Sequence, residues 1–399
     1  MHDRLHAWDG DDLIGIFSRA ANGAIDFTYA PDVVRPISLS LPLEGGWRAD
    51  VPRNFLEGLL PDLDTELIRM KVALGAANTD PFTLLDLNDV TGGLSFTAED
   101  VPPTRSASPI EPMSAEDIAT RIRQARKENS AWWEGIDRRC RFSLAGTQGK
   151  FSMARIGDEW FWPSASLPST HIVKPEPVKA PGAIQIERAC LALADACGLE
   201  VPACGIVEAM GETAYITQRF DRAPTDTGVA RRLRIEDVNQ ALGLPTKDKY
   251  LPEASEVTAL LNSIDPTHEL AYTWFEQFAF NVHVGNADAH AKNYSLYLDS
   301  KVRLCPLYDC LTTAYWPRFT EDLAMSVNDI WFPHEVTPDD WAREGEACGL
   351  DGLRVRDIAR RVSEEVMSHM PEVLDTLTEP DIAKGMRCSI TKANEGMRK

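Results

Sequence analysis

The sequence lacks the features that mark secreted, membrane-spanning and zinc-binding proteins. Its eight cysteines include no C-x-x-C pair, so buried thiols in a reducing compartment fit better than disulfides or a zinc site. The Met1 end, MHDRLHAWDGDD, has no apolar signal core, and no stretch approaches the about 18 uninterrupted apolar residues of a membrane-spanning helix. We therefore expect a cytoplasmic protein with no membrane segment.

Basic residues are also in short supply. The chain has 41 Lys and Arg against 61 Asp and Glu, which gives a formal net charge of −20. This charge opposes direct electrostatic docking on nucleic acid or on an anionic membrane, because both are themselves negative. A basic protein partner is easier to accommodate.

The amino-terminal part predicts a small β-rich subdomain. Residues 13–17 and 24–29 flank Asn22-Gly23, a dipeptide that tolerates the positive φ of a hairpin turn. Residues 36–43, PISLSLPL, alternate as a further strand would. Two helices are expected next, at 54–60 and 63–74.

A change of composition marks the clearest domain boundary. Residues 101–113, VPPTRSASPIEPM, are rich in Pro and Ser and poor in large apolar groups. Ser114 and Asp117 then resemble a capping box that opens a helix. We expect an α+β fold with three domains: residues 1–105, 106–230 and 231–399.

The most informative stretch is 280–311, FNVHVGNADAHAKNYSLYLDSKVRLCPLYDCL. Phosphoryl transfer needs a carboxylate that accepts the proton of the attacking hydroxyl, plus an amide and a second carboxylate that hold Mg²⁺. In the protein-kinase catalytic loop the base Asp precedes the metal-binding Asn by five positions, which is the interval from Asp288 to Asn293. Asp309 follows a predicted hairpin, where the other metal ligand should be. The segment therefore predicts a base and two Mg²⁺ ligands.

Two other interpretations of this segment stay open. Asp and Asn are common turn formers, so the cluster could be only a solvated turn. Alternatively, His283, Asp288 and His290 could bind a metal ion in a hydrolase. However, His283 falls most simply on the preceding helix, and no further Cys/His cluster completes such a site.

Upstream residues follow the order of parts in a kinase small lobe. Residues 143–150, SLAGTQGK, form a loop of small residues, which lets backbone N–H groups approach phosphates. A hairpin, a strand at 171–174, and a helix at 182–197 come next. The loop matches neither G-x-G-x-x-G nor a Walker sequence, and a plain turn is the alternative.

Three lysines compete to contact the phosphates, Lys174, Lys150 and Lys179. Lys174 ends the strand, and Glu187 on the following helix could hold it in place, although Glu187 could equally be a surface residue. Residues 218–221, QRFD, should connect the lobes, where backbone groups can hydrogen-bond adenine. Further on, a helix from Pro266 carries an apolar stripe every four residues, which predicts core rather than a ligand site: Leu270, Trp274, Phe278 and Val282. Further helices are expected at 236–242, 253–263, 355–370 and 381–388.

Several motifs stand in order over nearly the whole chain. They are SLSLPL, NFLEGLLPD, RFSLAGTQGK (141–150), HIVKP (171–175), TQRFDR (217–222), EDVNQALGLPTKDKY (236–250), GNADAHAKN (285–293) and PLYDCL (306–311). Together they resemble the HipA family of bacterial serine/threonine kinases, the toxin halves of HipA/HipB toxin–antitoxin pairs. The combination is specific even though its single pieces are not.

The resemblance implies a two-lobed protein-kinase-like fold with an extra amino-terminal β-rich subdomain and a mainly helical carboxyl-terminal lobe. It implies an ATP- and Mg²⁺-dependent kinase with Asp288 as catalytic base and Asn293 and Asp309 as metal ligands. It also implies nucleotide contacts from Ala145, Gly146, Thr147, Gln148, Lys150, Lys174, Gln218, Phe220, Asp221, His290 and Lys292.

The resemblance further implies regulation and partners. Ser143 would be autophosphorylated, which displaces the phosphate loop and shuts the enzyme off. The partner would be a small HipB-like helix-turn-helix antitoxin, which provides any DNA contact, and the protein substrate would be an aminoacyl-tRNA synthetase, especially the glutamyl enzyme. The outcome would be growth arrest and persistence.

Two departures from the family pattern stand out. Gly149 occupies a position where an acidic residue is frequent, and Gln218 one where glutamate is common. Two alternatives to the protein kinase also stay open: a small-molecule kinase of the aminoglycoside or choline type, and a catalytically inactive module that binds an antitoxin or assembles on DNA.

Overall fold

We examined the protein in a computed structural model, which describes residues 3–105, 110–130, 141–144 and 148–399. Residues 1–181, 203–236 and 240–247 form one compact unit, the first unit. Residues 182–202, 237–239 and 248–399 form another, the second unit. Each is described by itself.

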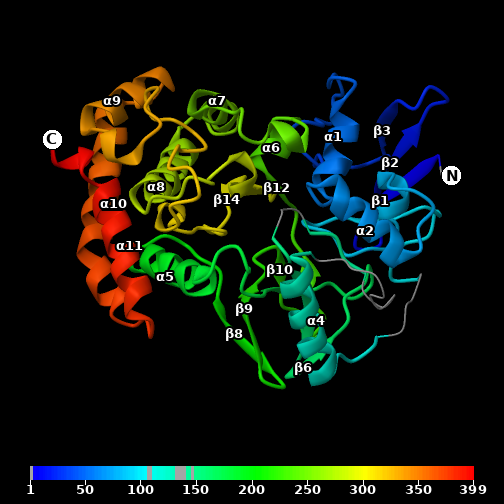
Figure 1. The fold of residues 1–399 in the computed structure, drawn as a ribbon. Coiled ribbons are helices and arrows are strands. Elements are labelled where there is room, and N and C mark those ends of the chain that lie inside the picture. Colours follow the sequence, from blue (N-terminus) through cyan, green and yellow to red (C-terminus); the bar gives the residue numbers. More distant parts are fainter. Residues whose placement is uncertain (1–2, 106–109, 131–140, 145–147) are drawn as a thin grey trace. The chain divides into compact units, whose positions relative to one another are not determined.

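A four-stranded antiparallel sheet with the order β3-β2-β1-β4 opens the first unit (Figure 1). Its strands are β1 (Arg4–Asp9), β2 (Asp12–Arg19), β3 (Ile25–Tyr29) and β4 (Ser95–Thr97). The predicted hairpin is confirmed, because β2 pairs with β3 around Gly23, which has a φ of 83°. Strand β1, which the pattern did not predict, pairs with both β2 and β4.

The strand expected at residues 36–43 is wrong. This segment forms only an isolated bridge between Ser38 and Leu41. The Tyr29 hydroxyl holds it instead, donating to the Leu41 carbonyl and accepting from the Ile37 N–H at 3.0 Å. Its two prolines lack the N–H that a central strand donates, so the alternation of apolar and polar residues here reflects burial in a turn.

The predicted helices of the first unit are present. Helices α1 (Val51–Gly58) and α2 (Asp64–Leu74) are separated at Pro61, and the short α3 (Pro81–Leu84) follows them. Helix α4 (Ala115–Glu128) begins with the predicted capping box, in which Ser114 and Asp117 each bond the other's backbone N–H.

A five-stranded antiparallel sheet carries the predicted phosphate-binding elements. Its order is β6-β5-β7-β9-β8. The strands are β5 (Phe151–Ile156), β6 (Glu159–Phe161), β7 (His171–Lys174), β8 (Cys204–Ala209) and β9 (Glu212–Gln218). Strand β7 lies in the middle and pairs with both β5 and β9, so the residues of the predicted lysine strand have a neighbour on each side.

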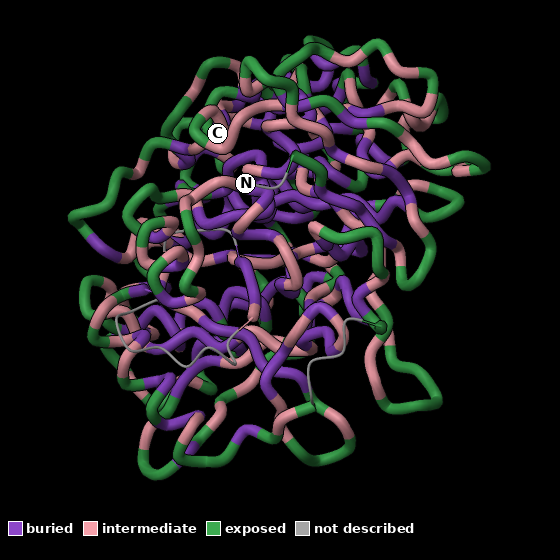
Figure 2. The backbone as a smooth tube through the Cα atoms, turned by 90° about the vertical axis from the view of Figure 1, so that its right-hand side faces the viewer, coloured by how far each residue is buried: buried purple, intermediate pink, exposed green. Residues whose placement is uncertain are grey.

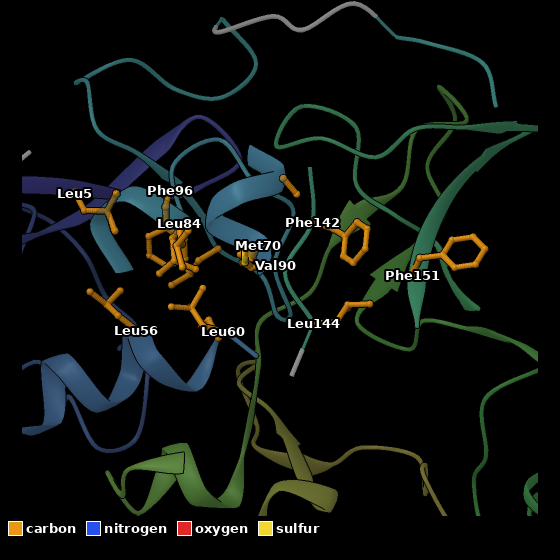
Figure 3. Packing of buried hydrophobic residues seen from close by; sticks show 14 of the residues in the cluster. Leu5, Leu56, Leu60, Met70, Leu84, Val90, Phe96, Phe142, Leu144 and Phe151 are labelled. Carbon is orange, nitrogen blue, oxygen red and sulfur yellow. The ribbon is translucent and has the colours of Figure 1, made fainter. Parts of the chain in front are cut away.

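One hydrophobic cluster joins the two sheets of the first unit (Figure 3). It extends from Leu5 of β1 to Phe151 of β5 and includes Phe142 and Leu144. Each fully buried side chain of this size contributes about 1.5–3 kcal/mol relative to exposure. Because Phe142 and Leu144 flank Ser143, the segment that leads into the predicted phosphate loop is anchored in this core.

The second unit is mainly helical. Its longer helices are α5 (Ala183–Ala196), α7 (Ala254–Ile264), α8 (Glu269–His283), α9 (Pro338–Ala347), α10 (Gly352–Leu374) and α11 (Pro380–Ala393). The predicted stripe on α8 is confirmed as core, since all four of its residues are buried and the rings of Trp274 and Phe278 stack with centroids 5.0 Å apart. Figure 2 colours the backbone by burial. Helix α9 was not predicted. Among the described residues, no helix has the length and apolar character to cross a membrane.

Shorter elements complete the chain. Strand β13 (Ser295–Tyr297) pairs antiparallel with β14 (Arg303–Leu304) in the second unit, where the sequence predicts a hairpin. The others are β10 (Arg222–Ala223), β11 (Arg231–Arg232), β12 (Ile235–Asp237), α6 (Val238–Ala241), and the 3-10 turns Thr246–Asp248, Ala291–Asn293, Thr313–Tyr315, Pro333–Glu335 and Gly396–Arg398.

The predicted α+β class is confirmed, and the domain boundaries at 105 and 230 stay predictions. The first unit contains residues on both sides of position 105. Helix α5, which we placed in the small lobe, belongs to the second unit.

Candidate active site

Helix α8 leads into the predicted catalytic segment. Gly285 turns the chain with a φ of 70°. The side chains that fix this turn are uncharged: Asn286 Nδ2 donates to Asn281 Oδ1 at 2.7 Å, and Thr313 Oγ1 donates to the Gly285 carbonyl at 3.2 Å. Buried amides and a hydroxyl therefore fix the turn that precedes Asp288.

Asp288 presents an exposed carboxylate on a fixed backbone. Its N–H donates to Asn286 Oδ1 at 3.2 Å, and its carbonyl accepts from Asn293 Nδ2 at 2.8 Å. Its side chain accepts from the Tyr250 hydroxyl, which lies 2.6 Å from Oδ1. Both neighbours of Asp288 along the chain are buried, whereas Asp288 itself is exposed. A carboxylate in this position can accept a proton from a hydroxyl that approaches from solvent.

Asn293 and Asp309 supply the donor atoms that Mg²⁺ prefers. Asn293 is buried and uses its Nδ2 on the Asp288 carbonyl, so its Oδ1 is the atom suited to coordinate a cation. Asp309 has a φ of 52°, a conformation that costs a non-glycine residue about 1–3 kcal/mol and is common at functional sites. An amide oxygen and a carboxylate fit a magnesium ion better than zinc, for which nitrogen and sulfur ligands dominate.

Tyr308 connects Asp309 to the catalytic segment. Its hydroxyl donates to the Lys292 carbonyl at 2.6 Å. Burial raises the pKa of Tyr308 well above its ordinary value, so the phenol stays a neutral donor. The residue before Asp309 is thus bonded to the residue before Asn293, which fixes the two predicted metal ligands to one framework.

Glu187 of helix α5 and Asp309 both act on the buried thiol of Cys310. Both carboxylates are close enough to the thiol of Cys310 to raise its pKa further, although burial is the largest cause. The neighbouring Cys190 has its Sγ 3.4 Å from Thr312 Oγ1. The structure therefore brings the predicted helix glutamate and one predicted metal ligand to the same buried thiol.

Lys292 and His290 are buried and have partners within the second unit. Lys292 Nζ lies 3.4 Å from Asp237 Oδ2, an ion pair. The His290 ring meets the Tyr250 ring edge to face, with centroids 4.9 Å apart. Both residues were expected to contact nucleotide; in the structure they pack around the segment that holds Asp288.

The alternative metal site of a hydrolase gains no support. Within the described ranges, no group of three or more His, Cys, Asp or Glu side chains could hold a metal ion. His283, the last residue of α8, is buried with its ring centroid 6.0 Å from that of Trp341. Burial lowers the pKa of His283 to about 4, so it is a neutral core residue.

The first unit contains the predicted phosphate loop, whose residues Ala145, Gly146 and Thr147 lie outside the described residues. Ser143, just before them, is fully buried. Its Oγ donates to the Leu59 carbonyl at 2.7 Å, and its N–H donates to the Asp89 carbonyl at 2.7 Å. The hydroxyl is therefore engaged by the protein rather than offered to solvent.

Gly149 explains one departure from the family pattern. A Cβ at this position would lie 2.6 Å from the Ala125 carbonyl oxygen and 2.7 Å from the Ser130 nitrogen. Both contacts are with backbone at the end of α4, which cannot yield as a flexible side chain would. Gly149 is thus required by packing, and Gln148 and Lys150 on either side of it are half-buried.

The lysine candidates differ in burial. Lys174, at the end of β7, is buried, and its Nζ lies 5.8 Å from the centre of the Tyr215 ring on the paired strand β9. Lys179 is exposed. A buried lysine is a stronger candidate for a phosphate contact, because desolvation strengthens its attraction to an anion.

A buried charge network surrounds Asp221. Its Oδ1 accepts from Arg219 Nε at 2.9 Å, and its Oδ2 accepts from Arg222 Nη1 at 2.7 Å and from the Gly92 N–H at 2.9 Å. Burial alone would raise the pKa of Asp221, but the two guanidinium groups outweigh it and hold that pKa far below its usual range. The Asp221 carboxylate is committed to these bonds, whereas Gln218 is exposed and Phe220 half-buried.

Asp89 is the second carboxylate of this network. It is fully buried, and its Oδ1 accepts from Arg222 Nη2 at 3.1 Å and from Arg232 Nη2 at 2.7 Å. Its Oδ2 accepts from the Ser169 hydroxyl at 2.5 Å. Since the Asp89 carbonyl also binds the Ser143 N–H, one residue joins the charge network to the start of the phosphate loop.

Comparison with known proteins identifies the family. The family model described as the HipA-like C-terminal domain matches residues 142–370, and the one described as the HipA N-terminal domain matches residues 5–97. A protein of Sinorhizobium fredii named putative kinase Y4mE is 32% identical over 395 residues, which cover 93% of this chain and 91% of that protein. The chain belongs to the HipA family.

Two further HipA relatives come from Shewanella oneidensis. A protein named serine/threonine-protein kinase toxin HipA is 28% identical over 361 residues, 85% of this chain and 81% of that one. A solved complex of HipA, HipB and operator DNA contains a chain with a TM-score of 0.79 at 25% identity, covering 98% of this chain and 96% of that chain. The predicted HipA resemblance and kinase-like fold are confirmed.

Sequence reasoning missed two residues of this HipA-family chain. Tyr250, which bonds Asp288, closes the motif EDVNQALGLPTKDKY, so its place in a motif was the available signal. Asp89 gave no signal, because its arginine partners lie 133 and 143 residues away in the sequence.

Proposed function

We propose that this HipA-family chain is an ATP- and Mg²⁺-dependent protein serine/threonine kinase. The observation that carries the proposal is the exposed Asp288 carboxylate beside both candidate metal ligands. Asn293 bonds the Asp288 carbonyl directly, and the bond from Tyr308 to Lys292 ties the neighbouring Asp309 to the same segment. The names of the relatives support it, since they include a putative kinase and a serine/threonine-protein kinase toxin.

Each residue has a role that its surroundings suit. Asp288 orients the acceptor hydroxyl and takes its proton. Asn293 and Asp309 would hold Mg²⁺, which neutralises charge on the nucleotide phosphates when it is bound. Lys174 would add a second positive charge at the phosphates, and the loop at 143–150 would offer backbone N–H groups to them.

We infer that the partner is a helix-turn-helix antitoxin of the HipB type. The solved relative is a complex of HipA with HipB and operator DNA, and a chain with a net charge of −20 suits a basic partner that makes the DNA contact itself. The chain would then act as a toxin. Its substrate class, by family, is an aminoacyl-tRNA synthetase or another protein of translation.

Autophosphorylation of Ser143 is part of the proposal. A phosphate carries about −1.5 to −2 charges at neutral pH. Such a group would not fit where the Ser143 hydroxyl now donates to the Leu59 carbonyl, since the site is fully buried. The modified segment would therefore stay out of its pocket, and the phosphate loop would no longer be anchored.

Asp288→Gln tests the proposal. We expect it to abolish transfer of phosphate from [γ-³²P]ATP to protein while nucleotide binding by calorimetry is retained, because the carboxylate is exposed and contributes little to folding. Asp158→Gln is the matched control, since Asp158 is also exposed and lies in the turn between β5 and β6. Full transfer by Asp288→Gln would refute Asp288 as the base.

The same assay identifies the molecule that accepts the phosphate. Label on protein supports a protein kinase, and label on added aminoglycoside or choline would show a small-molecule kinase instead. If the wild-type chain neither binds nor consumes ATP, the interpretation as an inactive binding module is correct and the kinase proposal fails.

A further inference from the structure

Tyr250 lies at the candidate active site without a role in the reaction described so far. Its side chain is 48% exposed, yet its hydroxyl donates to Asp288 Oδ1 at 2.6 Å. An O–H···O distance this short is typical of a hydrogen bond to a charged oxygen. We propose, on the basis of the proposed function, that Tyr250 is a positioning residue: it holds Oδ1 of Asp288 and so helps to keep the carboxylate in the orientation that accepts the proton of the acceptor hydroxyl.

The Tyr250 ring is fixed to the same segment that carries Asp288. It meets the His290 ring edge to face, at an interplanar angle of 88°, and Lys249 Nζ lies 5.4 Å from its centre. The backbone is fixed as well, because the Ala291 N–H donates to the Lys249 carbonyl at 3.1 Å. Tyr250 is therefore packed against, and bonded through its neighbour to, the residues that follow Asp288.

The Asp288 carboxylate needs such a contact. Its N–H and carbonyl are bonded to Asn286 and Asn293, but these bonds do not set the side-chain torsions of an exposed aspartate. A carboxylate has two oxygens that accept hydrogen bonds equally well, and the bond from the Tyr250 hydroxyl to Oδ1 restricts which of them faces which way. A displacement of about 1 Å at a reacting group can cost about 100-fold in rate.

A phenol suits this role chemically. A phenol carries its proton near neutral pH, so it donates to the carboxylate and does not compete as a base. It also binds Oδ1 without adding charge, which leaves the negative charge of Asp288 available to the acceptor.

Tyr250→Phe removes the hydroxyl and keeps the ring on His290. We expect kcat for transfer from [γ-³²P]ATP, measured as label on the chain itself and as ADP released, to fall about 10- to 100-fold, the usual size for loss of a hydrogen bond to a charged group. The KM for ATP should stay within about twofold, because the proposal gives Tyr250 no nucleotide contact. An unchanged kcat, or a raised kcat, would overturn the proposal; the latter would show that Tyr250 competes with the acceptor.

Tyr272→Phe is the matched control. The Tyr272 hydroxyl accepts from the Asp351 N–H at 3.0 Å in the same unit, so its bond supports another part of that unit's backbone. We expect this variant to lose a comparable amount of thermal stability without a change in kcat. Equal losses of kcat in both variants would reduce Tyr250 to a structural residue.

A crystal structure of Tyr250→Phe separates this inference from the proposed function. The wild-type carboxylate should occupy one position with Oδ1 on the phenol, and the variant carboxylate should turn away or occupy several positions. If wild-type protein transfers no phosphate at all, the kinase proposal fails, and this comparison still decides whether Tyr250 holds Asp288. An identical Asp288 position in both crystals would reject the positioning role.

Discussion

The two units hold their predicted functional residues by different means. In the first unit Asp89 and Asp221 are buried among arginines, and every carboxylate oxygen has a cationic or hydroxyl partner. In the second unit amides and a hydroxyl fix the turn before Asp288, one ion pair, Lys292–Asp237, lies beside the residues after it, and Asp288 is exposed. Buried, paired carboxylates organise structure, whereas a carboxylate at the surface can be reached by a hydroxyl from solvent.

Removal of a buried carboxylate should have the largest effect on stability. We expect Asp89→Ala to lower the free energy of unfolding by about 3–5 kcal/mol, because it leaves Arg232 without its carboxylate partner and Arg222 with Asp221 alone. Urea unfolding measures this loss.

Asp158→Ala is the control for that experiment. Asp158 is also paired with an arginine, Arg155, but its side chain is 99% exposed. Exposed pairs contribute little, so the change should stay within about 1 kcal/mol. Equal losses from both substitutions would contradict the structural role of the buried network.

Acidification separates the contributions of buried histidines and buried carboxylates to stability, because the two kinds of group respond in different pH ranges. Burial lowers the pKa of His283 in the second unit to about 4, against about 6.5 in an unfolded chain. Between these values the unfolded state binds more protons, so stability falls as pH falls from about 6.5 to 4, by up to about 3 kcal/mol. Asp89 and Asp221 have pKa values below the ordinary one, so their stabilisation is lost only below about pH 4.

His283→Leu tests this order. The free energy of unfolding of the variant should depend less on pH between about 6.5 and 4 than that of the wild type, while the loss below pH 4 remains. His171 is the internal control in the first unit. Burial, and the nearby Arg155 to a lesser extent, lower its pKa to about 4 as well. Because its ring is less buried than that of His283, His171→Leu should change the pH dependence of the free energy of unfolding less. If the free energy of unfolding depended on pH equally in the wild type and in His283→Leu, the expectation would be wrong.

The smallest expected effect compares two capping boxes, one in each unit. Ser114 and Asp117 cap α4 at an exposed site, and Thr337 and Asp340 cap α9 at a partly buried one. Replacing Ser114 or Thr337 by Ala should each cost about 1 kcal/mol, with the larger loss at Thr337, because the Asp340 it orients also accepts from Asn328. Thermal denaturation measures both, and a larger loss at Ser114 would reverse the expectation.

Local patterns predicted most of the fold. The Asn22-Gly23 turn, the Ser114 capping box and the four-residue stripe of α8 each act over a few residues, and each is present. The strand at 36–43 failed because the side chain that sets its conformation, Tyr29, lies outside it. Periodicity within a segment cannot report such a contact.

The site was predicted unevenly for the same reason. Asp288, Asn293 and Asp309 share one short stretch with a known interval, so their types and spacing pointed to a base and two oxygen ligands. Asp221 was expected near the nucleotide, which stays a prediction, and its carboxylate is bonded to Arg219 and Arg222 within the same short motif. Nothing in a charged motif distinguishes a ligand contact from an ion pair until its burial is known.

The burial of Ser143 has a kinetic consequence. Because its hydroxyl is fully enclosed and bonded to the Leu59 carbonyl, any kinase reaches it only in the small fraction of molecules in which this segment has locally opened. If Ser143 is phosphorylated as we propose, the rate of modification is lowered in proportion to the fraction of molecules in which the segment is open. Burial of one hydroxyl can in this way slow its own phosphorylation. Substitutions at Leu59 or Phe142 that loosen the packing around Ser143 should raise the rate of that phosphorylation.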